Sequence, residues 1–347
     1  NHIKHSSSSW IFLAFLLLSA CVPGKARETS TPTVLPPTAT LAPTATRTAT
    51  AAATATAVLV TSSPQPILYV EPPALDLAAE SAVLIDSRTG DVLFEKNAHQ
   101  RMFPASTTKV MTALLALEYF DPDEMIWVGD EVNLAWTTFR LDAQKAGLLY
   151  SQEISMKELL YGLMLVSGSD AAFVIAANVA RRESDDPFLP LGPAIERFCE
   201  LMNQRARELG ALESNFTSPD GYQDPNHYSS AYDLALIARA AMQDARFREI
   251  VGAAFYRPGE SVSNTGTFSQ VWTNTNRLLD QNDEHYYAPA TGIKTGTTDE
   301  AGYCLISSAD LDGQTYIAVA LNSTQEGVWS DSTAMLEFAR KDHSDQE

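Results

Sequence analysis

The stretch PASTTKVMTALLALEYF, residues 104–120, places Ser106 three positions before Lys109 at the start of an apolar run. The spacing of its apolar residues predicts a helix that begins at Ser106. Residues three apart on a helix share a face, with Cβ atoms roughly 5–6 Å apart. The hydroxyl and the amine can therefore meet, and a neutral amine is able to take the proton of a serine that acts as a nucleophile.

Outward from this stretch, strand patterns occupy both ends of the chain and helical patterns the middle. Residues 81–98 predict two strands around the turn at 87–90, and residues 301–309 and 315–323 predict a hairpin around an Asp-Gly turn. The segments with helical spacing are 155–166, 171–182, 193–210, 229–242 and 332–341. This order predicts an α+β fold, in which an antiparallel sheet is assembled from distant segments, flanked by helices, and carries an inserted helical lobe.

Two further short motifs follow the serine–lysine pair. About one S-x-x-K match is expected by chance in a chain of this length, and a capped helix with a solvated lysine would explain it equally well. However, SGS at residues 167–169 lies between two apolar helical stretches, and KTG at residues 294–296 leads into the first strand of the late hairpin. Three motifs in this order indicate a site built around Ser106.

The order and separation of these motifs resemble the S-x-x-K, S-x-N and K-T-G set of penicillin-binding proteins and serine β-lactamases. The surrounding sequence resembles one family more closely, the D-alanyl-D-alanine carboxypeptidases, which are low-molecular-mass penicillin-binding proteins. The stretches that carry this resemblance are residues 97–118, 159–172, 227–240 and 292–309. The resemblance covers about residues 75–340 and implies the β-lactamase/transpeptidase-like fold. It also implies a serine peptidase that removes the terminal D-alanine of peptidoglycan stem peptides and that is inhibited by β-lactams.

The resemblance assigns the catalytic steps to three residues. Ser106 would attack the peptide carbonyl and carry the acyl group, Lys109 would be the general base, and Ser167 would relay a proton to the leaving amine. For Lys109 to act at neutral pH its pKa must fall by about three units, which costs roughly 4 kcal/mol. Burial and a second positive charge both lower the pKa of a lysine, and Lys294 would supply that charge. The N-terminus of the helix adds a positive potential of its own.

The resemblance assigns substrate binding to the KTG segment. Lys294 would also help to hold the terminal carboxylate of the substrate, with hydroxyl contacts from Thr295 and Thr297. The backbone N–H groups of Ser106 and Thr297 would form the oxyanion hole. Gly296 would let the substrate lie along the edge of the strand, because it has no side chain there.

The sequence departs from the family pattern at two places. The second motif usually has asparagine in its third position, where this chain has Ser169, and a hydroxyl offers fewer hydrogen bonds than an amide. Many relatives also carry an arginine just after the last core strand, where this chain reads NSTQEGVWSDS, with Glu326 and no arginine. Carboxylate binding would then depend on Lys294 and the threonines, or on another arginine such as Arg277.

Two alternative functions remain open. A serine β-lactamase needs a carboxylate that activates the deacylating water, and Glu200 and Glu208 are available, although both fit the polar face of an amphipathic helix. A catalytically idle homologue that binds the cell wall is the second alternative, suggested by the two departures. His227 could serve as a base, but a serine–lysine pair needs none, so we expect it to have a structural role.

Charge and cysteine content exclude several classes of partner. The 347 residues carry a formal net charge of −19, without a run of Lys or Arg that could bind phosphates, so we expect no nucleic-acid partner. Three cysteines, Cys21, Cys199 and Cys304, and six histidines show no metal-ligand spacing. We therefore expect no metal and no cofactor.

The N-terminal 66 residues predict an anchor and a spacer. Lys4 precedes the apolar run WIFLAFLLLSA, which ends at Cys21 and suits the core of a secretory signal. The ending LSAC resembles a bacterial lipobox, in which Cys21 is lipidated. An ordinary signal peptide with an incidental cysteine is the alternative interpretation. The Thr/Ala/Pro-rich composition of residues 22–66 predicts a disordered tether. We thus expect a lipoprotein signal peptide at 1–21 and a peptidase domain at 67–347, held outside the bacterial cytoplasmic membrane.

Overall fold

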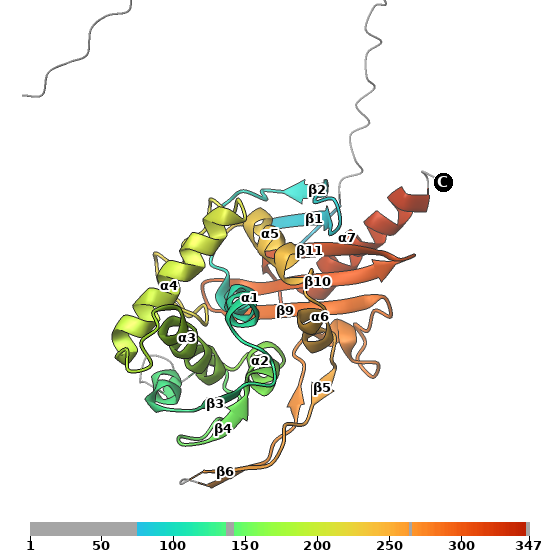
Figure 1. Cartoon of the computed structure of the whole chain (residues 1–347). Helices are drawn as coiled ribbons and strands as arrows, with labels where there is room; N and C mark the ends of the chain where they lie inside the picture. Colours follow the sequence, from blue (N-terminus) through green and yellow to red (C-terminus); the bar gives the residue numbers. More distant parts are fainter. Residues whose placement is uncertain (1–74, 137–141, 264–265, 345–347) are drawn as a thin grey trace, which may run out of the picture. The chain divides into compact units, whose positions relative to one another are not determined.

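The computed structural model describes residues 75–136, 142–263 and 266–344, and its centre is a five-stranded antiparallel sheet (Figure 1). The strands lie in the order β2-β1-β11-β10-β9. Their bounds are Ser81–Asp86 (β1), Val92–Lys96 (β2), Ala290–Thr298 (β9), Gly302–Leu311 (β10) and Gln314–Ser323 (β11). Strand β1 from the start of the domain thus pairs with β11 from its end, which confirms a sheet assembled from distant segments.

Both faces of the sheet are buried, which explains why its central strands are apolar almost without a break. Along β1, Val83 and Ile85 belong to one hydrophobic core, while Leu84, between them, belongs to a second. Alternate side chains of a strand point to opposite faces. Helix α5 (Ala231–Ala241) contributes to the first core and α7 (Gly327–Ser344) to the second, so each helix covers one face of the sheet.

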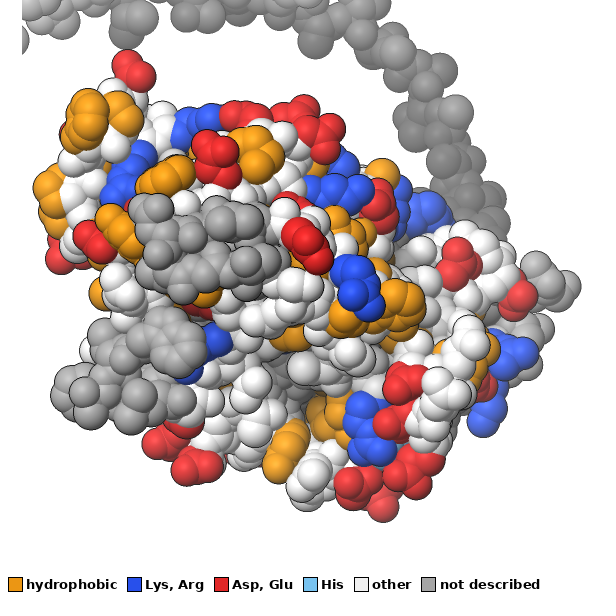
Figure 2. Space-filling view, turned by 90° about the horizontal axis from the view of Figure 1, so that it is seen from below, with side chains coloured by type: hydrophobic (Ala, Val, Ile, Leu, Met, Phe, Trp, Pro, Cys, Tyr) orange, Lys and Arg blue, Asp and Glu red, His pale blue; other side chains and the backbone are white. Residues whose placement is uncertain are grey.

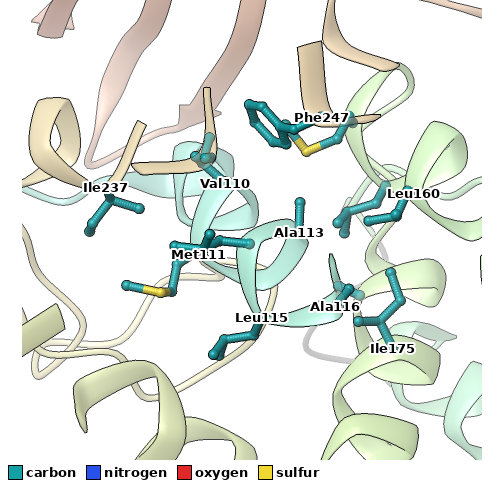
Figure 3. Packing of buried hydrophobic residues seen from close by; sticks show 14 of the residues in the cluster. Val110, Met111, Ala113, Leu115, Ala116, Leu160, Ile175, Ile237 and Phe247 are labelled. Carbon is teal, nitrogen blue, oxygen red and sulfur yellow. The ribbon is translucent and has the colours of Figure 1, made fainter. Parts of the chain in front are cut away.

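The remaining helices form a lobe between β2 and β9 in the chain. They are α1 (Lys109–Tyr119), α2 (Met156–Met164), α3 (Ser169–Glu183), α4 (Leu191–Glu208) and α6 (Ala245–Val251). Helix α1 is the centre of the lobe, and its residues 109–117 are all buried. Figure 3 shows side chains of α1 among those of Leu160, Ile175, Ile237 and Phe247, which come from four other helices. A helix that is apolar all round is buried on all sides, and α1 therefore holds Lys109 in the interior.

Several predicted boundaries shift by a few residues. Ser106 does not begin the α-helix: residues Ala105–Thr108 form a 3-10 turn, η1, and α1 starts at Lys109. The KTG motif precedes the hairpin, as predicted, but it lies inside a further strand, β9, at the edge of the sheet. Ser230 is the N-cap of α5, and its side chain accepts a hydrogen bond from Asp233 N.

Short elements complete the fold. Three two-stranded antiparallel sheets pair β3 (Met125–Trp127) with β4 (Glu153–Ser155), β5 (Phe255–Tyr256) with β8 (Trp272–Thr273), and β6 (Ser261–Ser263) with β7 (Gly266–Phe268). Two further 3-10 segments are η2 (Asp130–Trp136) and η4 (Arg277–Leu279). Within the described ranges, none of the helices has the length and apolar character needed to cross a bilayer. The predicted signal peptide, Cys21 and the tether lie outside the described residues.

Candidate active site

One cavity of about 620 Å³ brings the predicted motifs together. Residues of all three motifs line it, namely Ser106, Ser167, Ser169, Thr295, Gly296 and Thr297. The two lysines of the motifs, Lys109 and Lys294, are each 1% exposed and so lie behind the cavity wall. A larger groove of about 870 Å³ is lined by other residues and contains none of the motif residues.

The serine and the lysine of the first motif are in contact. Lys109 Nζ lies 2.9 Å from Ser106 Oγ and donates to the backbone carbonyl of Asp220 at 2.8 Å. The α-helix that starts at Lys109 fixes the amine, while the preceding 3-10 turn presents the hydroxyl to the cavity. The separation allows direct proton transfer between the two groups.

The turn that carries Ser106 is fixed by two glycines from distant segments. Ala105 has a φ of 47°, a left-handed conformation that is costly for an alanine. A Cβ on Gly221 would lie 1.9 Å from Ala105 O, and a Cβ on Gly296 would lie 3.0 Å from Ser106 N. Both positions therefore exclude a side chain because backbone packs against backbone there. The missing side chain of Gly296 thus makes room for the turn that holds Ser106, and its predicted role beside the substrate stays a prediction.

His227 supports the same turn from the protein interior. The backbone N–H of Thr217 donates to His227 Nδ1 at 3.1 Å, and Thr108 Oγ1 lies 2.8 Å from His227 Nε2. Because Nδ1 accepts, the ring proton belongs on Nε2, which then donates to the threonine hydroxyl. The side chain is 1% exposed and does not line the cavity, in agreement with the structural role expected for it.

The second motif forms the turn between α2 and α3. Ser167 has a φ of 60°, which is strained for a serine and is held by the surrounding packing. Ser169 is the first residue of α3, and its backbone N–H donates to Gln144 O at 2.8 Å. Ser169 and Ser167 are both buried and line the cavity.

Asp170 is a supporting residue that the sequence did not reveal. Its carboxylate is buried and accepts from the backbone N–H groups of Ala146, Gly147 and Leu148 at 2.7–3.0 Å. These bonds attach the segment that follows Gln144 to the N-terminus of α3. An acidic residue in the first turn of a helix was the available signal, but its partners are distant in sequence.

The pKa of the buried Lys294 amine is strongly lowered. Burial, together with the nearby charge of Lys109, lowers the pKa of Lys294 well below its ordinary value. Its Nζ donates to Thr295 O at 2.9 Å. We expected Lys294 to carry the charge that lowers the pKa of Lys109, whereas burial and the charge of Lys109 lower the pKa of Lys294 itself.

The rest of β9 faces the cavity. Thr295 Oγ1 lies 2.6 Å from Thr275 Oγ1, on the segment that leads into η4. Arg277, in η4, also lines the cavity, as does Trp329 of α7. The guanidinium of Arg277 is oriented by Asp283, at 2.7 Å from Nε, and by Glu284, at 3.3 Å from Nη2. The cavity wall thus holds an arginine, although from a different segment than in many relatives.

Acidic residues named from the sequence lie elsewhere. Glu200 and Glu208 are on α4, paired with Arg197 and Arg205, and neither lines the cavity. Glu326 pairs with His285 at 3.1 Å.

Within the described ranges, one group of acidic and histidine side chains has the spacing of metal ligands. Glu284, His285 and Glu326 bring ligand atoms within 4.8 Å of one another. Both glutamates are exposed and already contact Arg277 or His285.

Comparison with known proteins agrees with this geometry. The family described as D-alanyl-D-alanine carboxypeptidase, peptidase S11, matches residues 68–325. The chain is 35% identical over 263 residues to D-alanyl-D-alanine carboxypeptidase DacF of Bacillus subtilis, and the match spans 75% of this chain and 62% of that protein. It is 32% identical over 269 residues to D-alanyl-D-alanine carboxypeptidase of Streptomyces sp. strain K15, spanning 76% of this chain and 87% of that one.

Solved structures give the same result. The crystal structure of the Streptomyces K15 DD-transpeptidase has a TM-score of 0.68 and 31% identity, and the match covers 76% of this chain and 97% of that one. D-alanyl-D-alanine carboxypeptidase DacD from Francisella tularensis has a TM-score of 0.65 and 28% identity, covering 79% and 73%. The predicted fold class is confirmed, and the chain belongs to the D-alanyl-D-alanine carboxypeptidase family.

Proposed function

We propose that this chain is a serine-type D-alanyl-D-alanine carboxypeptidase that hydrolyses the terminal D-alanine of peptidoglycan stem peptides. The observation that carries the proposal is the contact of 2.9 Å between Ser106 Oγ and Lys109 Nζ at the wall of a cavity shared with the SGS and KTG motifs. The names of the relatives support the same reaction.

Acylation begins with the neutral amine of Lys109. It takes the hydroxyl proton of Ser106 while Oγ bonds to the carbonyl carbon of the scissile peptide bond. The resulting oxyanion accepts hydrogen bonds from the backbone N–H groups of Ser106 and Thr297, in line with the close packing of β9 on the Ser106 turn. The carbon–nitrogen bond then breaks, and the leaving D-alanine amine receives its proton through Ser167.

Deacylation repeats the same steps with water. Lys109 takes a proton from a water molecule, the hydroxide attacks the acyl carbon, and Ser106 Oγ leaves with the proton. A second stem peptide that replaced water would give transpeptidation, and the Streptomyces K15 relative carries both names, carboxypeptidase and DD-transpeptidase. The positions of Glu200 and Glu208 outside the cavity argue against a β-lactamase that uses either of them.

In this mechanism Lys109 and Lys294 hold one proton between them, and catalysis needs that proton on Lys294. Lys109 acts as a base only when the proton resides on Lys294, yet the pKa of Lys294 is lowered by burial and by Lys109. The terminal carboxylate of a bound substrate would favour an ammonium on Lys294, because opposite charges attract most strongly in a low dielectric. Substrate binding would in this way leave Lys109 neutral.

The carboxylate itself needs a partner at the cavity surface. Lys294 is too buried to line the cavity, whereas Arg277, Thr295 and Thr297 do. A guanidinium matches the planar geometry of a carboxylate and stays charged at every working pH. We assign carboxylate recognition to Arg277 with the two threonines. The hydroxyl of Ser169 binds the substrate amide that an asparagine binds in relatives.

The N-terminal segments suit an enzyme of the cell envelope. Residues 1–21 would be the signal peptide, Cys21 the lipidated residue and 22–66 a tether of about 45 residues, which as a flexible coil spans roughly 35–40 Å. The domain from residue 67 would then be lipid-anchored on the outer face of the bacterial cytoplasmic membrane, with peptidoglycan within reach. Labelling with a radioactive fatty acid tests this: the wild-type chain incorporates the label and Cys21→Ser does not.

One experiment tests the catalytic proposal. The protein is incubated with a penicillin and its intact mass is followed, with Ser106→Ala as control. A long-lived adduct on the wild type alone is the expected result, together with D-alanine release from a pentapeptide. Rapid penicillin turnover would indicate a β-lactamase, and absence of both adduct and D-alanine would indicate an idle homologue that binds the wall.

A further inference from the structure

The larger groove, of about 870 Å³, lies at the end of α3 that is remote from the proposed active site. Its walls come from the end of α1, from β3, from η2 and from residues 178–191. Helix α3 has 15 residues, with Ser169 at the active-site end and Arg181 and Arg182 at the groove end. At 1.5 Å per residue the helix separates the two by roughly 22 Å.

Large apolar side chains are exposed together in this groove. Trp127 is 55% exposed, Phe188 88%, Met125 59% and Tyr150 44%, and all four line it. In Figure 2, hydrophobic side chains reach the surface in several places on the left, the side on which α3, α4 and β3 lie in Figure 1. Single exposed apolar residues are ordinary, but several in one concave site indicate a ligand.

A buried carboxylate in the wall of the groove lacks a partner. Glu131 is 2% exposed, and its Oε1 accepts from Arg181 Nη1. Its Oε2 has no hydrogen-bond partner among the residues that the structure describes. Gly129, which also lines the groove, leaves space for this oxygen, since a Cβ there would lie 2.6 Å from it. Buried acceptors are nearly always satisfied, so Oε2 calls for a donor from outside.

The charges of the groove exclude an anionic ligand. Arg181 is paired with Glu131, and Arg182 is paired with Glu124 through two bonds of 2.6 and 2.8 Å. Hydrogen bonding to Arg182 lowers the pKa of Glu124 to about 2, so this pair stays ionised. Asp130 and Asp185 add two more acidic side chains to the lining. The ligand should therefore carry no net negative charge and should be rich in hydrogen-bond donors.

We infer that this groove binds the glycan strand of peptidoglycan. A sugar ring presents an apolar C–H face, which stacks on aromatic rings whose faces are electron-rich. Its hydroxyl and acetamido groups are neutral donors that suit Glu131 Oε2 and the other carboxylates. A second copy of this chain, with a formal net charge of −19, would bring like charge to the acidic side chains of the groove.

The inference rests on the proposed function, because a glycan site helps only an enzyme that acts on the attached stem peptides. A stem peptide of about five extended residues spans roughly 17 Å, comparable to the length of α3. A polymer that occupied the groove with its sugars could thus present a stem peptide to Ser106. Joining two weak contacts on one polymer raises the effective concentration of the peptide at the active site. The enzyme would act on glycan-linked stem peptides in preference to free ones.

The test uses the full chain carrying Ser106→Ala and, as probe, neutral N-acetylglucosamine oligomers, which keep the sugar rings, hydroxyl groups and acetamido groups of the glycan strand without a free carboxylate. Trp127→Ala combined with Phe188→Ala should weaken binding at least about tenfold. Phe255→Ala, which removes an aromatic residue 67% exposed on β5, is the matched control and should bind like the parent. Equal binding by all variants, or equal loss in the control, would overturn the inference. So would a groove-dependent dimer without glycan binding.

A second measurement separates this inference from the proposed function. With Ser106 intact, the Trp127→Ala/Phe188→Ala variant should release D-alanine from a free pentapeptide at the wild-type rate and from intact peptidoglycan several-fold more slowly. If no variant releases D-alanine, the proposed function fails while glycan binding still supports the groove. If both substrates slow equally, with unchanged thermal unfolding, the groove has no separate role.

Discussion

Lys109 and Lys294 are two amines buried behind the wall of one cavity, each 1% exposed. Burial and the charge of Lys109 lower the pKa of Lys294 well below its ordinary value. In the unfolded chain both lysines are solvated and hold their protons at neutral pH. A lowered pKa means that folding disfavours the proton on Lys294, so this buried amine lowers the free energy of unfolding.

Lys294→Met should stabilise the fold while it abolishes acylation by penicillin. The variant keeps the volume of the side chain and removes a buried amine, which we expect to raise the free energy of unfolding by about 1–2 kcal/mol at pH 7. Between the lowered pKa and about 10.5 the unfolded wild type binds more protons than the folded one, so its stability rises with pH. The advantage of the variant should thus shrink towards pH 10. Thermal unfolding of both proteins between pH 7 and pH 10 measures this difference. A Lys294→Met variant that is less stable than the wild type at pH 7 would refute the prediction.

The sequence predicted the catalytic residues of the site better than the contacts that hold them in place. Ser106 and Lys109 are neighbours in the chain, and a helical period is enough to bring them together. The strands at the end of the domain were likewise readable, because β10 and β11 carry apolar residues on both faces. These features depend on local spacing, which a single sequence displays directly.

The supporting contacts could not be read because they join distant residues through the backbone. The carbonyl of Asp220 accepts from Lys109, which lies 111 positions earlier, and any residue type offers a carbonyl. The requirement for glycine at 221 arises from Ala105 O, again far away. Which lysine loses its proton depends on burial and on acceptors that only the fold defines.

Gly221→Ala should disable the active site. The new Cβ would lie 1.9 Å from Ala105 O, next to the nucleophile, and Gly221 also has a φ of 80°. Gly313→Ala is the matched control, since Gly313 has a φ of 83° and nothing lies within 4 Å of its Cβ position. Gly313→Ala should lower the free energy of unfolding by about 1–2 kcal/mol, because alanine is strained in the left-handed conformation. Gly221→Ala should lower the free energy of unfolding clearly more than Gly313→Ala and should form no penicillin adduct. Equal midpoints of chemical denaturation for the two variants would contradict the close packing of Gly221 on Ala105.

Asp233 should make stability depend on pH near neutrality. Burial, and then its hydrogen bond with Glu213, raise the pKa of Asp233 to about 7. Between about pH 4 and 7 the folded chain holds a proton that the unfolded chain has lost, so this contribution to stability is complete at low pH and is lost as the pH rises through 7. Asp233→Asn removes the titration and keeps an oxygen for Ser214 and for the backbone of Glu213.

Between pH 5 and pH 8 the variant should gain about 2–3 kcal/mol relative to the wild type, because over about two of these pH units the folded wild type holds a proton on Asp233 that the unfolded chain has lost. Urea denaturation at both pH values measures the difference. Parallel curves for the two proteins would show that Asp233 is ionised throughout.

Arg277→Gln should remove the preference for a free terminal carboxylate. Arg277 lines the cavity beside Thr295, and Asp283 and Glu284 fix its orientation. A charge-assisted, bidentate contact is worth about a tenfold change in KM, so the variant should need about ten times more of a carboxylate-ended peptide at unchanged kcat. A peptide with an amidated end should be handled equally by both proteins. Arg340→Gln, which changes an exposed arginine of α7, is the control. If Arg277→Gln impairs both peptides alike, the arginine only braces η4 through its two acidic partners, and carboxylate recognition must come from the threonines of β9.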